Sequence, residues 1–323
     1  MYCMMRTSSL LLTVLVGSVV ACAARNSDGD VTPTSSNAFA GVGVGQAQED
    51  REIADPDVLV DDGGLWLTGT NNRNPTKFPL YRGTDPSSEF RLMGWYVPHG
   101  PDSYKYCHLW APNLVKVNSG YRMWFTAKRV EQAAPCGGID EISVWYVDAP
   151  SVAAFYDGTV LTPSAYTKNG ANAETVMENR LGPASMRIDP DELVDGASTW
   201  VSYVYFQDGN RIAAFDRSSP TSAPIILVGD PPTPEPLAMS DDGVAIYEAP
   251  DLVKAGDYYL VYSVGGFDRD YALWVKRAAT MAGLASATPR QLTFPLYDGS
   301  GARLESAGHS SVFMWNDKPF IAY

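Results

Sequence analysis

One hairpin pattern occurs five times in this chain and constrains its fold more than any other feature. The clearest copy spans residues 246–266: a Glu248-Ala249-Pro250 entry, an apolar strand, a turn at residues 255–257 and a tyrosine-rich second strand. The other copies read ADPDVLVDDGGLWLTGT, WAPNLVKVNSGYRMWFTA, IDPDELVDGASTWVSYVY and GHSSVFMWNDKPFIAY. They align on Pro56, Pro112, Pro190, Pro250 and Ser310, at intervals of 56, 78, 60 and 60 residues.

An all-β, five-bladed β-propeller is the fold that this repeat predicts. A four-stranded blade needs roughly 40–50 residues plus loops, which these intervals provide. One hairpin of this kind would be uninformative, since many hairpins join an apolar run, a glycine turn and an aromatic run. The last copy has only residues 308–323. We therefore expect either that residues before Asp55 complete the fifth blade or that this blade is incomplete here.

The first 50 residues have the composition of a targeting segment and a tether. Residues 1–22 combine Arg6 with an apolar run, Leu10 to Val20, that is too short to span a bilayer. The run ends Val19-Val20-Ala21-Cys22, which resembles a bacterial lipobox whose cleavage leaves a lipidated Cys22. An ordinary secretory signal is the alternative. Residues 23–50 form a polar, low-complexity linker, and residues 51–323 form the propeller domain.

This reading places the protein outside the cytoplasm. It would be anchored by lipid to a bacterial membrane or cell surface, or free in the periplasm or medium. Cys3 leaves with the signal and Cys22 would carry lipid, so Cys107 and Cys136 remain, and an oxidising compartment favours a disulfide between them. With 3 His in the chain, a zinc site is not expected.

Charge and aromatic content narrow the class of ligand. The formal charge is 24 − 37 = −13, which argues against nucleic acid, because phosphates require a basic footprint. The same charge argues against polyanionic substrates and favours a neutral ligand. The 18 Tyr and 8 Trp suit both β-strands and stacking on sugars.

Ionisable side chains recur at one position of the repeat. The residue before the aligned proline or serine is Asp55, Ala111, Asp189, Ala249 or His309, and Glu248 stands one residue earlier in its copy. Equivalent positions of a propeller form a ring around its axis, so Asp55, Asp189 and Glu248 are expected to converge. Asp-Pro also marks ordinary turn entries, but the shared register favours a functional cluster, in which like charges raise one another's pKa values.

In this order, the five hairpin motifs resemble the blade-start motifs of glycoside hydrolase family 43. The resemblance covers about 270 residues, essentially everything beyond the linker. It implies a five-bladed propeller that hydrolyses arabinosyl or xylosyl linkages with inversion. The expected partner is a neutral, pentose-containing polysaccharide or oligosaccharide, and the only expected membrane contact is the N-terminal lipid anchor.

The resemblance also assigns roles to residues. It implies that Asp55 is the general base, Glu248 the general acid, and Asp189 the carboxylate that orients this acid and raises its pKa. His309 matches a family histidine near the axis, where some members hold a calcium or sodium ion. Trp110 is a candidate for stacking on sugar. Asn113, which stands where the family usually has an acidic residue, is a candidate polar contact with substrate.

Two other functions are compatible with a propeller. A non-catalytic glycan-binding lipoprotein would keep the fold without turnover, but the presence of all three carboxylates argues against it. A protein-binding propeller would leave the converging carboxylates unexplained. The choices between arabinan and xylan, and between exo and endo action, depend on loops at the mouth of the site, which the sequence does not determine.

Overall fold

The computed structural model describes part of the chain as strands, short 3-10 helices and turns. The described residues are 19–20, 53–86, 88–99, 104–139, 142–165, 167–168, 171–172, 186–206, 210–219, 223–229, 246–266, 269–292 and 308–322. The predicted linker at 23–50, the lipidation site at Cys22 and most of the predicted signal segment lie outside these residues. No helix in the described ranges is long and apolar enough to cross a membrane.

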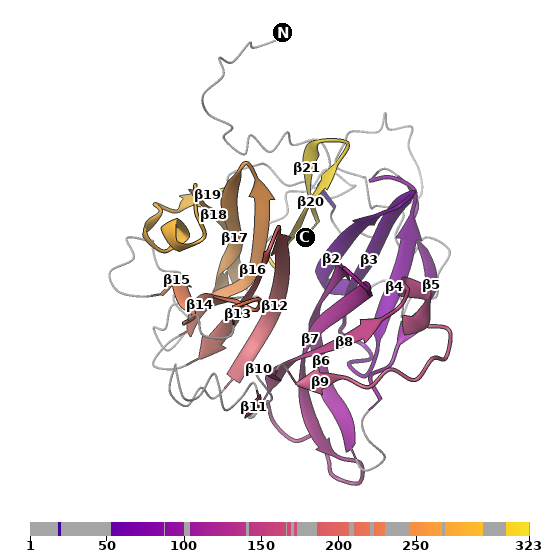
Figure 1. Cartoon of the computed structure of the whole chain (residues 1–323). Coiled ribbons are helices and arrows are strands. Elements are labelled where there is room, and N and C mark those ends of the chain that lie inside the picture. Colours follow the sequence, from indigo (N-terminus) through magenta and orange to yellow (C-terminus); the bar gives the residue numbers. More distant parts are fainter. Residues whose placement is uncertain are drawn as a thin grey trace.

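Four sheets of four antiparallel strands are arranged as blades (Figure 1). Blade 1 consists of β2 (Ile53–Asp61), β3 (Gly64–Asn71), β4 (Phe78–Gly83) and β5 (Arg91–Tyr96). Blade 2 consists of β6 (Tyr104–Val117), β7 (Gly120–Glu131), β8 (Ser143–Ala149) and β9 (Ser164–Ala165). Blade 3 consists of β12 (Met186–Asp195), β13 (Ser198–Phe206), β14 (Asn210–Asp216) and β15 (Ile225–Val228). Blade 4 consists of β16 (Tyr247–Ala255), β17 (Asp257–Gly266), β18 (Arg269–Ala278) and β19 (Arg290–Gln291).

The region formed by the fifth repeat does not contain the complete fifth blade that was predicted. It holds the hairpin of β20 (Ser311–Trp315) and β21 (Lys318–Ala322), to which β1 (Val19–Val20) adds in parallel. The described residues therefore form a β-propeller with four complete blades, not five. The physical reason is length, because the last repeat supplies enough residues for one hairpin only.

Smaller elements lie outside the blades. These are the β-ladder of β10 (Thr167–Lys168) with β11 (Ala171–Asn172), and the 3-10 helices η3 (Val152–Phe155) and η4 (Ala282–Ser286). Leu284 of η4 is fully buried in the apolar cluster of blades 3 and 4. Each cluster of this kind fills the space where neighbouring sheets meet.

The first strands of the repeats form a closed ring. β2 contacts β6, β6 contacts β12, β12 contacts β16, β16 contacts β20, and β20 returns to β2. In Figure 1 the hairpin β20–β21 lies between blade 4 and blade 1. The five hairpins predicted from the repeat are thus present and consecutive around one axis.

Every first strand is interrupted at the same repeat position. The residue before the aligned proline or serine has positive φ in all five copies: Asp55 (48°), Ala111 (46°), Asp189 (54°), Ala249 (53°) and His309 (47°). Positive φ is uncommon for residues other than glycine and marks a special backbone geometry. In the four complete blades the strand register shifts there, as in a β-bulge. We call these five residues the site ring.

A second set of side chains links each blade to the next. We call it the belt: Asp57, Asn113, Asp191, Asp251 and Ser311. Each belt side chain accepts a hydrogen bond from a backbone N–H of the following blade. The donors, in ring order, are Leu114 (2.7 Å to Asp57), Glu192 (3.1 Å to Asn113), Leu252 (2.7 Å to Asp191), Val312 (to Asp251) and Val58 (3.1 Å to Ser311). The last of these bonds closes the circle between the last and first repeats.

Cys107 of β6 and Cys136, which follows β7, form the predicted disulfide, with Cα atoms 5.7 Å apart. The bridge joins the beginning of β6 to the segment after β7 and closes a loop with a sequence separation of 29. A loop of about this length lowers the entropy of the unfolded chain by an amount worth roughly 3–4 kcal/mol.

We expect the double variant Cys107→Ala/Cys136→Ala to fold with a lowered melting temperature, because the blades do not depend on this bridge. Thermal unfolding followed by circular dichroism measures the change. The wild-type mature protein should show no free thiol in denaturant without reductant. Two titratable thiols would contradict the bridge.

Candidate active site

Three of the predicted residues meet at the top of the axis. Asp55 (β2), Asp189 (β12) and Glu248 (β16) come from three different blades, and the charges of Asp189 and Asp55 both raise the pKa of Glu248. Asp189 is buried, whereas Asp55 and Glu248 are partly exposed. The convergence predicted from the repeat is therefore present in the structure.

His309 lies within the same cluster. Its Nδ1 atom is 2.9 Å from Oδ1 of Asp55, so the first and last repeats are joined by an ion pair. Burial lowers the pKa of His309, but the charges of Asp55 and Asp189 outweigh burial and raise it to about 9. The imidazole is therefore protonated at neutral pH and places a positive charge beside Asp55.

Asp55 is held in its ionised form. Burial opposes ionisation, but the charge of His309 and hydrogen bonds from His309, Thr70 and the Ala111 N–H together leave its pKa below the usual value. Thr70 Oγ1 donates to Asp55 Oδ2 at 2.5 Å. A carboxylate that stays ionised can accept a proton from water.

Glu248 has the opposite behaviour. Burial, followed by the negative charge of Asp189, raises the pKa of Glu248 to about 7. Burial also raises the pKa of Asp189 to about 6. Asp189 Oδ2 accepts the backbone N–H of Ala249 at 3.0 Å, which fixes the strand that carries Glu248. The site thus contains one carboxyl that favours the ionised state and one that favours the protonated state.

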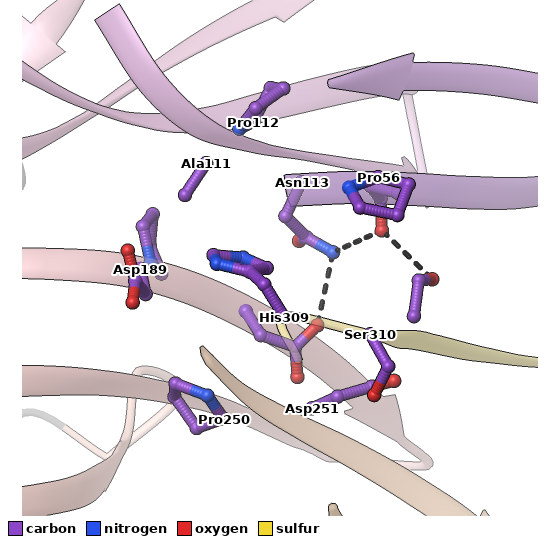
Figure 2. A pocket seen from close by; sticks show the side chains of 13 residues that line it. Pro56, Ala111, Pro112, Asn113, Asp189, Pro250, Asp251, His309 and Ser310 are labelled. Carbon is purple, nitrogen blue, oxygen red and sulfur yellow. Dashed lines mark hydrogen bonds between the residues drawn. The ribbon is translucent and has the colours of Figure 1, made fainter. Parts of the chain in front are cut away.

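Below this cluster is a narrow axial cavity of about 20 Å³, enough for about one water molecule (Figure 2). Its lining consists of the belt side chains, the four aligned prolines, and Ala111, Asp189, His309 and Ser310. In Figure 2 the His309 ring lies between Asp189 and Asn113. A sugar does not fit in this volume, so the cavity is the floor of the site.

Asn113 occupies a different level from the carboxylate cluster. Its amide nitrogen donates to Asp57 (3.1 Å) and to Asp191 (3.0 Å) (Figure 2). Its oxygen accepts the Glu192 N–H. These contacts occupy both amide hydrogens and make Asn113 a member of the belt. Asn113 also lines the axial cavity together with Asp189 and His309, and its predicted contact with substrate stays a prediction.

Trp110 lies at the level of Glu248. Both stand two residues before the aligned proline, and the Trp110 ring is half-buried, 5.7 Å from the ring of His108. Part of Trp110 also packs against the apolar cluster of blades 3 and 4. It is therefore positioned beside the cluster, with one part of its surface used in packing.

The predicted axial metal ion would need donor groups with free lone pairs. A protonated imidazole offers no lone pair, and His309 Nδ1 is already engaged with Asp55. In the described parts of the chain, no group of three or more His, Cys, Asp or Glu side chains is arranged to hold a metal ion. The described residues as placed therefore do not fit a directly ligated ion.

Sequence reasoning missed the belt and the neighbours of the cluster. Burial raises the pKa of Asp57 to about 6 and that of Asp191 to about 8, and it also raises that of Asp251. The signal was present, since the residue after the aligned proline or serine is Asp, Asn or Ser in every copy. Thr70, Ser263 and Tyr271, which contact the predicted residues, left no such signal.

One carboxyl group that favours the ionised state and one that favours the protonated state, brought together on a β-propeller axis, match the pair of carboxyl groups that a glycoside hydrolase uses. Comparison with protein families gives the same class: the family described as Glycosyl hydrolases family 43 matches residues 50–323. The chain belongs to glycosyl hydrolase family 43.

Solved structures with the same fold include relatives of low sequence identity. An α-L-arabinofuranosidase from Lactobacillus brevis has a TM-score of 0.59 at 16% identity, covering 83% of this chain and 81% of that chain. An endo-arabinase from Bacteroides thetaiotaomicron has a TM-score of 0.59 at 17% identity, covering 83% and 88%. A comparison with curated protein sequences found no match. The structural matches establish the fold, and the family match establishes the family.

Proposed function

We propose that this chain is an inverting glycoside hydrolase that cleaves arabinosyl or xylosyl linkages in plant polysaccharides or oligosaccharides. The observation that carries the proposal is the opposite ionisation of Asp55 and Glu248 within one cluster. Glycoside hydrolysis by inversion requires one ionised carboxylate to activate water and one protonated carboxyl to protonate the leaving oxygen.

In this mechanism Asp55 is the general base. His309 and Thr70 hold it ionised and fixed, so that it removes a proton from a water molecule attacking the anomeric carbon. Glu248 is the general acid and donates its proton to the glycosidic oxygen. Asp189 keeps Glu248 protonated near neutral pH and holds the Ala249 backbone beside it.

The substrate class is supported by the family and by the relatives. One solved relative with 15% identity and a TM-score of 0.51 is an α-L-arabinanase from Penicillium chrysogenum complexed with arabinobiose. We propose that a neutral pentose unit enters above the axial cavity and that Trp110 contacts its face. Asn113 is not included, because its amide is engaged in the belt.

A release assay tests the function directly. Aryl α-L-arabinofuranoside, aryl β-xyloside, arabinan and xylan are incubated with the protein, and released sugar is measured. Hydrolysis of at least one is expected. If none is hydrolysed but one binds in calorimetry, the chain is the glycan-binding propeller of the alternative hypothesis.

The pH dependence of kcat/KM follows from the ionisation of Glu248. The acid must be protonated, so activity is present below its pKa and is lost as the pH rises through about 7. We expect kcat/KM to fall about tenfold per pH unit on the alkaline side. The measurement is a pH profile at substrate concentrations below KM. A profile that stays flat to pH 9 would exclude Glu248 as the acid.

The variant Asp189→Asn removes a negative charge beside Glu248. It should move the alkaline limb of the pH profile to lower pH.

The proposal also covers the export of the protein and the role of the hairpin β20–β21. We propose that residues 1–22 are removed and that a lipid on Cys22 holds the enzyme at a bacterial membrane or surface, with residues 23–50 as a tether. A Cys22→Ala variant should then leave the membrane fraction.

We also propose that β20–β21 is the inner half of a fifth blade.

A further inference from the structure

Tyr271, on β18, contacts the proposed acid from within the same blade. Its hydroxyl donates to Oε2 of Glu248 at 3.0 Å. Glu248 on β16 pairs with Ser263 on β17, and Ser263 pairs with Leu273 on β18. Tyr271 stands two residues before Leu273 and reaches across Ser263 to the carboxyl group. This contact therefore spans three strands and is not a pairing of neighbouring residues.

The Tyr271 ring is fixed against the chain that carries His309. A Cβ atom at Gly308 would lie 1.7 Å from Cδ1 and 1.9 Å from Cε1 of Tyr271, so only glycine leaves space for the ring there. Gly308 directly precedes His309, whose Nδ1 is paired with Asp55. The aromatic ring thus packs between the acid and the segment that holds the base.

The hydrogen bonds around Tyr271 have one direction. The backbone N–H of His309, which can only donate, donates to Ser263 Oγ at 2.7 Å. A hydrogen bond joins the Ser263 side chain to the Tyr271 hydroxyl. With its oxygen accepting from His309, the Ser263 proton is available to Tyr271. The Tyr271 proton is then directed to Glu248 Oε2.

This direction determines which oxygen of Glu248 carries the acid proton. Oε2 accepts from Tyr271, so the carboxylic acid proton belongs on Oε1. A carboxyl group has two oxygens, and only one of them can face a glycosidic oxygen at hydrogen-bond distance. A residue that occupies one oxygen makes the other the donor.

We propose that Tyr271 is a positioning residue for the general acid: it engages Oε2 of Glu248 and leaves the protonated Oε1 to face the leaving group. This inference rests on the proposed function of Glu248. The hydroxyl also stabilises the carboxylate produced when Glu248 has given up its proton. Burial, together with the negative charge of Glu248, keeps the pKa of Tyr271 well above its usual value, so the phenol remains a donor throughout.

The test is Tyr271→Phe, which keeps the ring on Gly308 and removes only the hydroxyl. We expect kcat to fall about ten- to a hundredfold on substrates with poor leaving groups, with little change on substrates with good ones and little change in KM. The hydroxyl favours ionised Glu248, so its loss should move the alkaline limb of the pH profile to higher pH. A purely structural role would not move that limb.

Tyr121→Phe is the matched control. Tyr121 also donates from its hydroxyl to a carboxylate of another strand, Asp61, at 2.6 Å, but at the far end of the hairpin from the site. The Tyr121→Phe variant should leave the alkaline limb of the pH profile and the dependence of kcat on the leaving group unchanged. If Tyr271→Phe does not fold, Ser263→Ala, which keeps the phenol and removes its donor, should show a smaller shift in the same direction.

The outcomes separate this inference from the proposed function. In one outcome, Glu248→Gln loses activity, but the folded Tyr271→Phe enzyme has the same alkaline limb of the pH profile and the same leaving-group dependence as wild type. The role of Tyr271 is then wrong and the proposed function stands. If Glu248→Gln is fully active, the assignment of the acid is wrong. A Ser263→Ala enzyme identical to wild type, where Tyr271→Phe cannot be made, also overturns the role of Tyr271.

Discussion

Glu248→Gln is expected to lower kcat by about 10²–10⁴-fold on natural glycosides, whose leaving groups must be protonated. Glutamine keeps the size of the side chain and can still accept from Tyr271, but it has no acidic proton to transfer to the leaving oxygen. Dinitrophenyl glycosides leave as stable anions and need little protonation, so their hydrolysis should be reduced much less. The comparison of kcat on the two substrate types makes the measurement specific for the acid role.

Two further readouts complete this experiment. The alkaline limb near pH 7 should disappear in Glu248→Gln, because the group that titrates there is absent. Thermal unfolding should show that the fold is retained, since Asp189 still accepts the Ala249 N–H. Equal losses on good and poor leaving groups would remove Glu248 from the acid role.

Asp55→Ala should be inactive on every substrate, with a loss of about 10²–10⁴-fold, because the variant lacks the ionised carboxylate that is paired with His309. Azide can attack without a base and should restore part of the turnover. In an inverting mechanism the glycosyl azide has inverted configuration, which proton NMR of the product measures. An azide of retained configuration would instead show attack on a covalent intermediate.

Asp55→Asn serves as the structural control for this experiment. Asn retains an oxygen for Thr70 and for the Ala111 N–H, so the bulge in β2 should keep its geometry. It removes the charge that pairs with His309. We expect Asp55→Asn to be nearly as inactive as Asp55→Ala but closer to wild type in melting temperature. High activity in Asp55→Asn would show that ionisation at this position is unnecessary.

The repeat predicted the level of each side chain on the axis but not its neighbours. Alignment on the proline placed Asp55, Asp189 and His309 in one ring, and the structure gives all three the same positive φ. It also placed Glu248 one residue earlier, where it joins the same cluster. Repeat position determines height and direction in a propeller, which explains why these predictions were accurate.

Contacts between strands could not be predicted in the same way. The register shift between Glu248 and Asp251 decides which β17 residue faces the acid, and a shift of one residue would put Tyr271 out of reach. The place of Asn113 in a motif gave no indication that its amide would donate to Asp57 and Asp191 of two other blades. The number of complete blades also differed, because the last repeat has residues for only one hairpin.

The ion pair between Asp55 and His309 has a consequence for how the enzyme comes into being. Its two partners are 254 positions apart, among the longest separations that the chain offers. During synthesis the early blades can form from contacts within each repeat, but the base acquires its cation only after the hairpin β20–β21 has left the ribosome. We therefore expect chains that lack this hairpin to be inert even where the four complete blades have folded.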